Sequence, residues 1–223
     1  MDQDALRKIE QAYDSEPWYY DVRGFLILTF AYRSTLWAQI KLFGENMADP
    51  HLEVAIGSGT LFQIIQRWRT LRGLPKVSVT GFDYAEPMLA GAIRRFRNDP
   101  RVTLFRGDVT ALDLPDATFR SANVANALHC FPNVDAGLRE ICRVLSPGGT
   151  VAMNVLLYPR GPNVLRKIAE RINAWGMQKG ILFTPYECRD ILRRVRDAGL
   201  EIVEEHVTGN TCNIVARRPL PVS

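Results

Sequence analysis

The sequence predicts an α/β protein: a doubly wound, mostly parallel sheet that ends in an antiparallel edge hairpin. From residue 52 to residue 156, strand-like apolar runs alternate with amphipathic helix-like segments, the pattern of strands joined by crossover helices. The connecting turns are short, and no internal repeat is visible. Near the carboxyl end, two strand-like runs flank the turn 208–211, whose Thr-Gly-Asn-Thr sequence is typical of a hairpin.

Composition indicates one globular domain that acts on a small molecule. The chain has 223 residues, of which 47% are hydrophobic, enough to bury a full core. Its four cysteines are far apart with no CxxC pair, and the amino end has no secretory pattern. These features predict a reducing, cytoplasmic setting and no zinc site. The net charge of +4 is concentrated in helix-like stretches without a nucleic-acid motif, so no nucleic-acid partner is expected.

The first 45 residues predict helices that cover the sheet. Residues 1–15 have helical apolar spacing, and a cluster of rings follows at Trp18, Tyr19 and Tyr20. The apolar stretch 25–43 is interrupted by charged residues, which argues against a transmembrane segment and favours a long buried or surface-docked helix. Alternatively, the rings cap a small-molecule pocket.

The rest of the chain predicts seven strands and their helices in order. The predicted strands are 52–56, 77–82, 102–105, 121–127, 150–156, 201–207 and 212–217. The predicted helices are 61–72, 87–97, 134–145, about 163–175 and 185–198. Pro87 lies in a first turn, and the third helix ends before Pro147-Gly148-Gly149, as the chemistry of helix ends favours.

A glycine turn follows the first of these strands. Val54, Ala55 and Ile56 form an apolar run typical of a strand buried on both faces. Gly57 and Gly59 then allow a sharp turn with no Cβ in the way of a ligand. A ligand could therefore lie directly on the main chain here.

Four segments together resemble the class I S-adenosylmethionine-dependent methyltransferases, in particular the ubiquinone/menaquinone-biosynthesis-like (methyltransferase type 11) group. They are Glu53-Val54-Ala55-Ile56-Gly57-Ser58-Gly59, Gly81-Phe82-Asp83-Tyr84-Ala85-Glu86-Pro87-Met88-Leu89, Arg106-Gly107-Asp108-Val109 with 114–119, and 138–149. The resemblance implies a Rossmann-like seven-stranded domain over 46–217, a helical cap segment over 1–45 and a lid-like insertion at about 157–183. Two departures are Ala55, where relatives have glycine and where we expect extended backbone, and Arg120, where relatives usually have Asp.

The resemblance also implies a site for S-adenosyl-L-methionine, with S-adenosyl-L-homocysteine as product. Asp83 would accept both ribose hydroxyls, Asp108 the adenine amine, and Glu53 the methionyl ammonium, because ligands of such sheets lie at the strand ends. The cofactor-binding candidates are Glu53, Ala55, Gly57, Gly59, Asp83, Tyr84, Met88, Asp108, Val109, Asn126 and Ala127.

The end of the fourth strand borders both the methyl donor and the acceptor in relatives. His129 is the catalytic candidate, since imidazole can take a proton near neutrality, or it is a packed wall residue. His51 and His206 lie away from this end and are poorer candidates. No metal-ligand cluster is visible, so in-line displacement without a metal is expected.

Aromatic residues outside the sheet predict an apolar or aromatic acceptor. The substrate candidates are Tyr13, Trp18, Tyr19, Tyr20, Trp175 and Phe183. Two other functions stay open: a regulatory protein that binds the cofactor without methylating, and a nicotinamide-dependent dehydrogenase, although the turn lacks the third glycine of GxGxxG. The chain could also form a homodimer.

Overall fold

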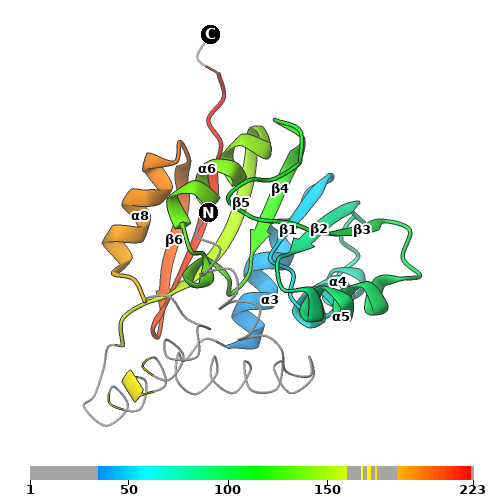
Figure 1. Ribbon diagram of the computed structural model, residues 1–223, viewed down its shortest axis with the longest axis horizontal. Helices are drawn as coiled ribbons and strands as arrows, with labels where there is room; N and C mark the ends of the chain where they lie inside the picture. The colour runs from blue at the N-terminus through cyan, green and yellow to red at the C-terminus, as the bar shows by residue number, and fades with distance from the viewer. Residues whose placement is uncertain (1–34, 160–166, 168–169, 172–173, 175–184, 222–223) are drawn as a thin grey trace.

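The computed structural model describes residues 35–159 and 185–221, together with the helical positions 167, 170, 171 and 174. These residues form a seven-stranded sheet flanked by helices (Figure 1). The four helical positions agree with the predicted helix at about 163–175. The predictions for residues 1–34, and the rest of the insertion, lie outside the described residues.

The described elements follow the predicted alternation of strands and helices. The strands are β1 (His51–Val54), β2 (Val79–Asp83), β3 (Val102–Arg106), β4 (Phe119–Val124), β5 (Leu145–Leu156), β6 (Glu201–Thr208) and β7 (Thr211–Arg217). The helices are α3 (Leu36–Glu45), α4 (Thr60–Leu71), α5 (Glu86–Phe96), the 3-10 helix η2 (Leu128–Cys130), α6 (Val134–Val144) and α8 (Cys188–Asp197).

The strand order confirms the predicted fold class. The sheet runs β3-β2-β1-β4-β5-β7-β6, with β1 to β5 parallel and β7 antiparallel to both of its neighbours. The order reverses between β1 and β4, so the crevice that binds ligands in open α/β sheets is expected at the carboxyl ends of these two strands.

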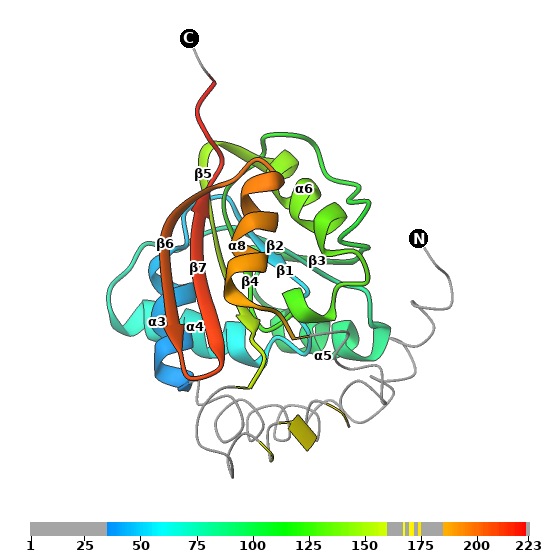
Figure 2. The same cartoon turned by 90° about the vertical axis from the view of Figure 1, so that its left-hand side faces the viewer.

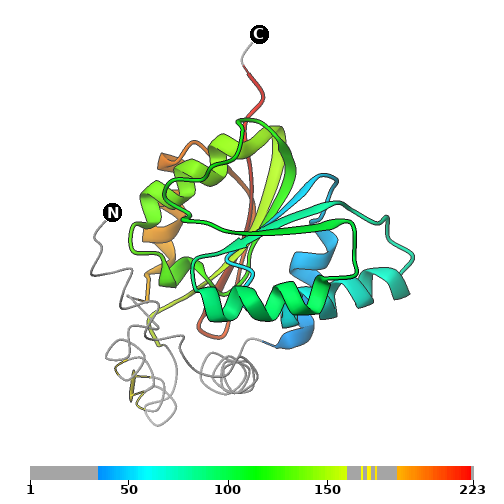
Figure 3. The ribbon, with the colours of Figure 1, turned by 45° about the vertical axis from the view of Figure 1, so that its right-hand side comes forward.

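Helices cover both faces of the sheet and define two cores. The larger core packs α6 and α8 on one face, and the smaller packs α3, α4 and α5 on the other (Figures 2 and 3). Successive residues of β1 point to opposite faces, as the period of a strand requires. Leu52 and Val54 therefore join the larger core, whereas the side chain of Glu53 faces α3.

The helix α3 overlaps only the second half of the apolar stretch 25–43, for which one long helix was predicted, because the backbone at Thr35 is extended and the helix starts at Leu36. It begins after Thr35, whose hydroxyl accepts the backbone N–H of Ala38 at 3.2 Å and so caps the helix. Its buried side chains include Ile40 and Phe43, which pack on the smaller core, and Gln39. Within residues 35–159 and 185–221, no helix combines the length and the apolar run needed to cross a bilayer.

Two predicted strands end earlier than expected. β1 stops at Val54 instead of residue 56, and β4 stops at Val124 instead of residue 127. In each case the next residues leave the extended conformation: Ala55 has φ 53° and Asn126 has φ 56°. Both are left-handed, a conformation that a regular strand cannot contain.

Candidate cofactor site

The turn after β1 is fixed by backbone conformation and by bonds to β2. Ala55, Gly57 and Gly59 all have positive φ, at 53°, 60° and 74°. The N–H of Ile56 donates to the Phe82 carbonyl at 3.0 Å, which ties the loop to the next strand. The chain then enters α4 at Thr60. The loop therefore lies where the carboxyl ends of β1 and β2 meet.

The two glycines of this turn are needed for different reasons. A Cβ at Gly57 would meet only the Cε atom of Met88, at an ordinary 3.6 Å. A Cβ at Gly59 would lie 2.6 Å from Cε2 of Phe96 and 3.3 Å from the Cβ of Ala92. Gly59 thus allows α5 to pack closely on the turn, and Gly57 is the glycine that leaves room for a ligand. The expectation that both serve ligand approach holds only in part.

Ala55 departs from its expected conformation. We expected extended backbone at this position, but its φ of 53° lies in the left-handed region that favours glycine. An L-residue there costs about 1–2 kcal/mol relative to its ordinary conformation. The turn therefore keeps the glycine-like geometry of the resembling family although the residue is alanine.

Replacing Ala55 by glycine should stabilise the protein. The Ala55→Gly change removes the left-handed strain, and the added freedom of the unfolded chain offsets part of the gain. We expect the free energy of unfolding in urea to rise by about 0.5–1 kcal/mol. The matched control is Ala198→Gly, at φ −76°, which should lower it by a similar amount. A loss of stability in Ala55→Gly would contradict this account of the turn.

Arg95 of α5 clamps the turn, a role that the sequence did not suggest. Its Nε donates to the Ser58 carbonyl at 3.1 Å, and its two terminal nitrogens donate to Thr60 Oγ1 at 2.8 Å and Gln63 Oε1 at 2.9 Å. One side chain therefore joins the turn, the first turn of α4 and α5. The only sequence signal was a basic run at 94–97, which is typical of a solvated helix face.

Asp83, the last residue of β2, reaches across to the glycine turn. Its Oδ2 accepts the N–H of Gly57 at 2.7 Å, and its Oδ1 accepts the N–H of Ala85 at 2.9 Å. Burial raises the pKa of this carboxyl to about 6, and the two N–H groups partly oppose the increase. Among the described residues Asp83 has no cationic partner. A buried carboxylate without one is costly, which is characteristic of a functional group rather than of a structural one.

Tyr84 and Met88, two further predicted cofactor residues, follow Asp83 in the chain. The guanidinium of Arg106 lies 5.1 Å from the centre of the Tyr84 ring, and its Nε donates to the Tyr84 carbonyl at 3.3 Å. Met88 is buried, and its Cε lies 3.6 Å from the position that a Cβ on Gly57 would occupy. The ring and the thioether thus border the same end of the sheet as the carboxylate.

Asp108 and Val109 follow the end of β3, the neighbour of β2. One oxygen of Asp108 accepts both the N–H and the hydroxyl of Thr110, each at 2.8 Å. Val109 is buried at 8% exposure. The N–H of Gly107 donates to the Asp83 carbonyl at 3.2 Å, so the two acidic segments lie at adjacent strand ends. This agrees with the expected juxtaposition of Asp83 and Asp108.

Glu53 lies in a buried polar network rather than at the open strand end. Its Oε1 is bonded to His51 Nε2 at 2.9 Å and to the amide of Asn123 at 2.8 Å. His51 in turn bonds Ser121 through Nδ1 at 2.7 Å. We expected His51 to precede its strand; it is instead the first residue of β1 and is fully buried. The network joins β1 to β4 at the switch point.

The segment after β4 brings Asn126, Ala127 and His129 together. The Ala127 carbonyl accepts the N–H of Cys130 at 2.8 Å, whereas no described residue donates to the Asn126 carbonyl. His129 is 7% exposed, and its Nδ1 is buried without a hydrogen-bond partner among the described residues. Burial lowers its pKa to about 4, so the expectation of a histidine that titrates near neutrality is wrong.

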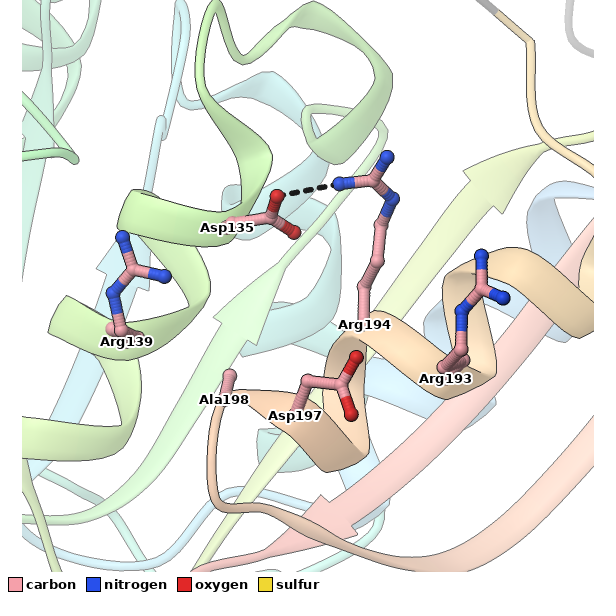
Figure 4. A pocket seen from close by; sticks show the side chains of 6 residues that line it. All are labelled: Asp135, Arg139, Arg193, Arg194, Asp197 and Ala198. Carbon is pink, nitrogen blue, oxygen red and sulfur yellow. Dashed lines mark hydrogen bonds and ion pairs between the residues drawn. The ribbon is translucent and has the colours of Figure 1, made fainter.

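A cavity of about 340 Å³ lies away from these residues, in the groove between α6 and α8 (Figure 4). Its lining consists of Asp135, Arg139, Arg193, Arg194, Asp197 and Ala198. An ion pair of 2.5 Å between Arg194 and Asp135 crosses it. None of the predicted site residues lines this cavity, and the strand ends do not contribute to it.

The structure describes the predicted cofactor residues but not the predicted substrate residues. The eleven predicted cofactor residues and His129 all lie in β1, β2 and α5 or in the segments that follow β1, β2, β3 and β4. The predicted substrate residues Tyr13, Trp18, Tyr19, Tyr20, Trp175 and Phe183 lie outside the described residues. Gln39, Arg95 and Asn154, which bond to the predicted site, were missed.

The fold and the site define the class of protein. A sheet of order 3-2-1-4-5-7-6 with an antiparallel seventh strand, a glycine turn after β1 and an acid ending β2 is the arrangement of class I S-adenosylmethionine-dependent methyltransferases. Residues 52–149 match the family model described as a methyltransferase domain. Over residues 52–149 the chain matches this family, and it has distant similarity to demethylmenaquinone methyltransferases.

Relatives and solved structures agree with this assignment. The chain is 29% identical over 185 residues (79% of the chain, 49% of the relative) to an uncharacterized chloroplastic methyltransferase of Arabidopsis thaliana. It is 32% identical over 155 residues (68% of the chain, 62% of the relative) to the demethylmenaquinone methyltransferase of Chlamydia trachomatis. The chain thus spans less than two thirds of the length of these relatives.

Two solved structures share the fold at low identity. One is a chain of the complex between the Haloferax volcanii Trm112 methyltransferase activator and a methyltransferase, with a TM-score of 0.66 and 20% identity over 92% of this chain and 97% of that one. The other is the [4+2]-cyclase SpnF, with a TM-score of 0.65 and 19% identity over 92% of this chain and 95% of that one. The second shows that this fold is not restricted to one kind of chemistry.

Proposed function

We propose that the protein transfers a methyl group from S-adenosylmethionine to a small apolar or aromatic acceptor. The observation that carries the proposal is the buried carboxylate of Asp83, held 2.7 Å from the N–H of Gly57 at the switch point of the sheet. Such a carboxylate can accept two hydroxyls of a ribose, and Gly57 leaves the adjacent main chain uncovered.

The residues present fit this cofactor. Asp83 would hold the ribose, Asp108 and Val109 the adenine, and the free carbonyl of Asn126 the methionyl ammonium. Glu53, the predicted partner of the same ammonium, is bonded to His51 and Asn123, so its proposed part is to hold β1 against β4 beside the site. When bound, S-adenosylmethionine supplies a methyl group on a positively charged sulfur, which a nucleophilic acceptor atom can take by in-line displacement.

The affinity for the cofactor should depend on pH through the ionisation of the Asp83 carboxyl. Because the pKa of this carboxyl is about 6, it is ionised above pH 6 and protonated below. Affinity for S-adenosylhomocysteine should be constant from pH 7 to 8 and fall by up to about tenfold per pH unit below pH 6. Calorimetric titration from pH 5 to 8 measures this. An affinity that does not change over this range would mean that Asp83 does not contact the ligand.

The same shift predicts how stability without cofactor depends on pH. A carboxyl whose pKa is higher in the folded than in the unfolded state binds protons preferentially when folded. The protonated Asp83 therefore adds to the free energy of unfolding. This contribution is fully present below the unfolded pKa of 3.8 and is lost as the pH rises through about 6. Asp83 therefore opposes folding at neutral pH, which is the expected cost of holding an ionised group ready for a ligand.

His129 is proposed to contact the acceptor as a neutral imidazole. With a pKa of about 4 it stays neutral at physiological pH, and its unpartnered Nδ1 can accept a hydrogen bond from an acceptor hydroxyl. We expect His129→Ala to lower kcat by about 100-fold or more while the affinity for S-adenosylhomocysteine changes less than threefold. His129→Asn, which keeps a polar atom, should recover part of kcat. Equal loss of kcat and affinity would make His129 a cofactor contact instead.

An aromatic acceptor is supported by two lines of argument. The predicted substrate residues Tyr13, Trp18, Tyr19, Tyr20, Trp175 and Phe183 supply rings that suit an apolar molecule. Relatives at 26–33% identity are named for methylation of demethylmenaquinone and of 2-phytyl-1,4-naphtoquinone. We therefore propose a hydroxylated or quinone-like ring as acceptor, and neither a nucleic acid nor a protein.

The setting proposed for this activity is a reducing compartment such as the cytoplasm. None of the four cysteines forms a disulfide, although the sulfurs of Cys188 and Cys212 lie 3.1 Å apart. Reduced thiols persist where glutathione and thioredoxin maintain them. Mass spectrometry of the protein denatured directly in an alkylating reagent should find all four thiols labelled, whereas labelling of the folded protein should omit Cys212, which is fully buried.

Two experiments test the proposal. Calorimetry should give saturable binding of S-adenosylhomocysteine and none of NAD or NADP; binding of a nicotinamide nucleotide alone would support a dehydrogenase. Incubation with methyl-labelled S-adenosylmethionine and a panel of phenols, hydroquinones and amines, followed by mass spectrometry, should then identify a labelled product. Binding without any labelled product over a broad panel would favour a cofactor-binding protein that does not methylate.

A further inference from the structure

Asn126, the second residue after the end of β4, has a carbonyl to which no described residue donates, and it is held by two buried amide side chains from distant parts of the chain. We propose that Gln39 of α3 and Asn154 of β5 are positioning residues: they keep Asn126 in the left-handed conformation that frees its carbonyl for the methionyl ammonium of the cofactor. This inference rests on the proposed function, whose cofactor site it extends to two residues outside the family motifs.

Asn154 makes two hydrogen bonds to Asn126. The side-chain Oδ1 of Asn154 accepts the backbone N–H of Asn126 at 2.6 Å, and its Nδ2 donates to the side-chain Oδ1 of Asn126 at 2.7 Å. Two bonds between the same residues fix orientation as well as distance. A single bond would allow the peptide of Asn126 to rotate.

Gln39 of α3 bonds to Asn126 from the side opposite Asn154, and we call these three side chains and their bonds the polar relay. The Nδ2 of Asn126 donates to the Oε1 of Gln39 at 2.8 Å. The amide of Asn126 therefore donates to α3 and accepts from β5, while its backbone N–H is also used. Gln39 and Asn154 are 87 and 28 residues away from it in sequence.

The surroundings indicate that these amides serve more than packing. Gln39 is 3% exposed and Asn154 is 1% exposed, and their chain neighbours Ile40, Met153 and Val155 are buried apolar residues. An amide at such a position costs free energy unless its polar atoms are bonded, and an aliphatic side chain would avoid this cost. Both amides bond to the same residue, Asn126.

The conformation of Asn126 needs such support. Its φ of 56° is left-handed, which asparagine tolerates better than most residues but does not prefer. No described residue donates to its carbonyl, whereas the next carbonyl, of Ala127, is used by the N–H of Cys130. The relay thus leaves one acceptor uncommitted at the switch point, beside the segment that contains His129.

Four variants of the full-length protein test the proposal by calorimetric affinity for S-adenosylhomocysteine and by urea unfolding. Asn154→Leu removes both bonds to Asn126, and Gln39→Leu removes the third. Gln39→Glu keeps the oxygen that accepts from Asn126 and serves as the conservative rescue. Ile40→Val, a core change on the same helix, is the control for loss of packing alone.

The expected results separate positioning from structure. Asn154→Leu should weaken binding by about tenfold or more, Gln39→Leu by about three- to tenfold, and Gln39→Glu by less than Gln39→Leu. Ile40→Val should lower stability without changing affinity. Hydrogen exchange of the Asn126 amide should accelerate in Asn154→Leu, with or without ligand.

Three outcomes have distinct meanings. If the wild-type protein binds S-adenosylhomocysteine and Asn154→Leu binds it equally well, the positioning role is wrong and the proposed function stands. If affinity falls in proportion to stability in all four variants, including Ile40→Val, the amides are only structural and the inference fails. If the wild-type protein does not bind this ligand, the proposed function itself fails and the inference with it.

Discussion

Replacing Asp83 by alanine should abolish useful affinity for S-adenosylhomocysteine. The change removes the acceptor for two ribose hydroxyls, and each charge-assisted hydrogen bond contributes about 1.5–3 kcal/mol. It also leaves the N–H groups of Gly57 and Ala85 without their acceptor, so the glycine turn keeps only the bond from the Ile56 N–H to the Phe82 carbonyl of β2. The dissociation constant measured by calorimetry should therefore rise by at least about 100-fold.

The fold should survive this change, because an ionised carboxyl with a raised pKa opposes folding at neutral pH. Circular dichroism and cooperative urea unfolding should remain close to those of the wild type. The matched control is Asp190→Ala, which removes an exposed acid that pairs with Arg193 on α8. It should leave the affinity unchanged. An Asp83→Ala protein that binds within about threefold of the wild type would end the assignment of this residue to the cofactor.

Replacing Gly59 by alanine should destabilise the protein more than any other single methyl addition in the turn. The new Cβ would overlap the ring of Phe96 at 2.6 Å and adopt a φ of 74°. Left-handed strain costs about 1–2 kcal/mol, and overpacking typically adds about 1–3 kcal/mol. We expect the free energy of unfolding to fall by about 2–4 kcal/mol, with cofactor affinity reduced because α5 must shift.

Gly73 provides a control for the backbone part of this effect. It has φ 65°, but a Cβ there would have no atom within 4 Å. Gly73→Ala should therefore cost only the strain, about 1–2 kcal/mol. The double change of Gly59→Ala with Phe96→Leu should cost less than the sum of the two single changes, because the shorter side chain makes room. Equal costs for Gly59→Ala and Gly73→Ala would mean that the packing of α5 on the turn is not tight.

The elements predicted best are those whose pattern is local. The helices α4, α5 and α6 begin and end within one residue of the predicted 61–72, 87–97 and 134–145, since amphipathic spacing and end signals such as Pro87 both lie within the segment. The hairpin was also predicted within one residue, because its turn sequence has few alternative conformations.

The ends of β1 and β4 were predicted less well, because the apolar composition of each run continues past the residue at which the backbone leaves the extended conformation. Ala55 and Asn126 belong to apolar runs, yet both are left-handed and end their strands early. The position of Ala55 as a glycine substitute was visible in the sequence, but its conformation was not. For His51 a signal was available: residues 51 and 53 share one face of a strand, so a bond between His51 and Glu53 follows from the period of two.

The polar relay could not have been predicted from periodicity. Gln39 and Asn154 each look like an isolated polar residue in an apolar segment. Their role depends on α3 and β5 packing on either side of Asn126, which lies 87 residues from Gln39 and 28 residues from Asn154 in the sequence. The pKa values of Asp83 and His129 depend in the same way on the depth at which each lies, which sequence does not give.

The position of β7 has a consequence for the order in which the protein can be made. β7 is the last strand to leave the ribosome, yet it lies between β5 and β6 and pairs with both. Strands β1 to β5 and every described residue assigned to the cofactor are synthesised before it, so this half of the sheet can assemble while the chain is still growing. Until residue 217 emerges, β5 keeps an open edge and β6 has no neighbour in the sheet, so the growing chain exposes strand edges that could pair with another chain.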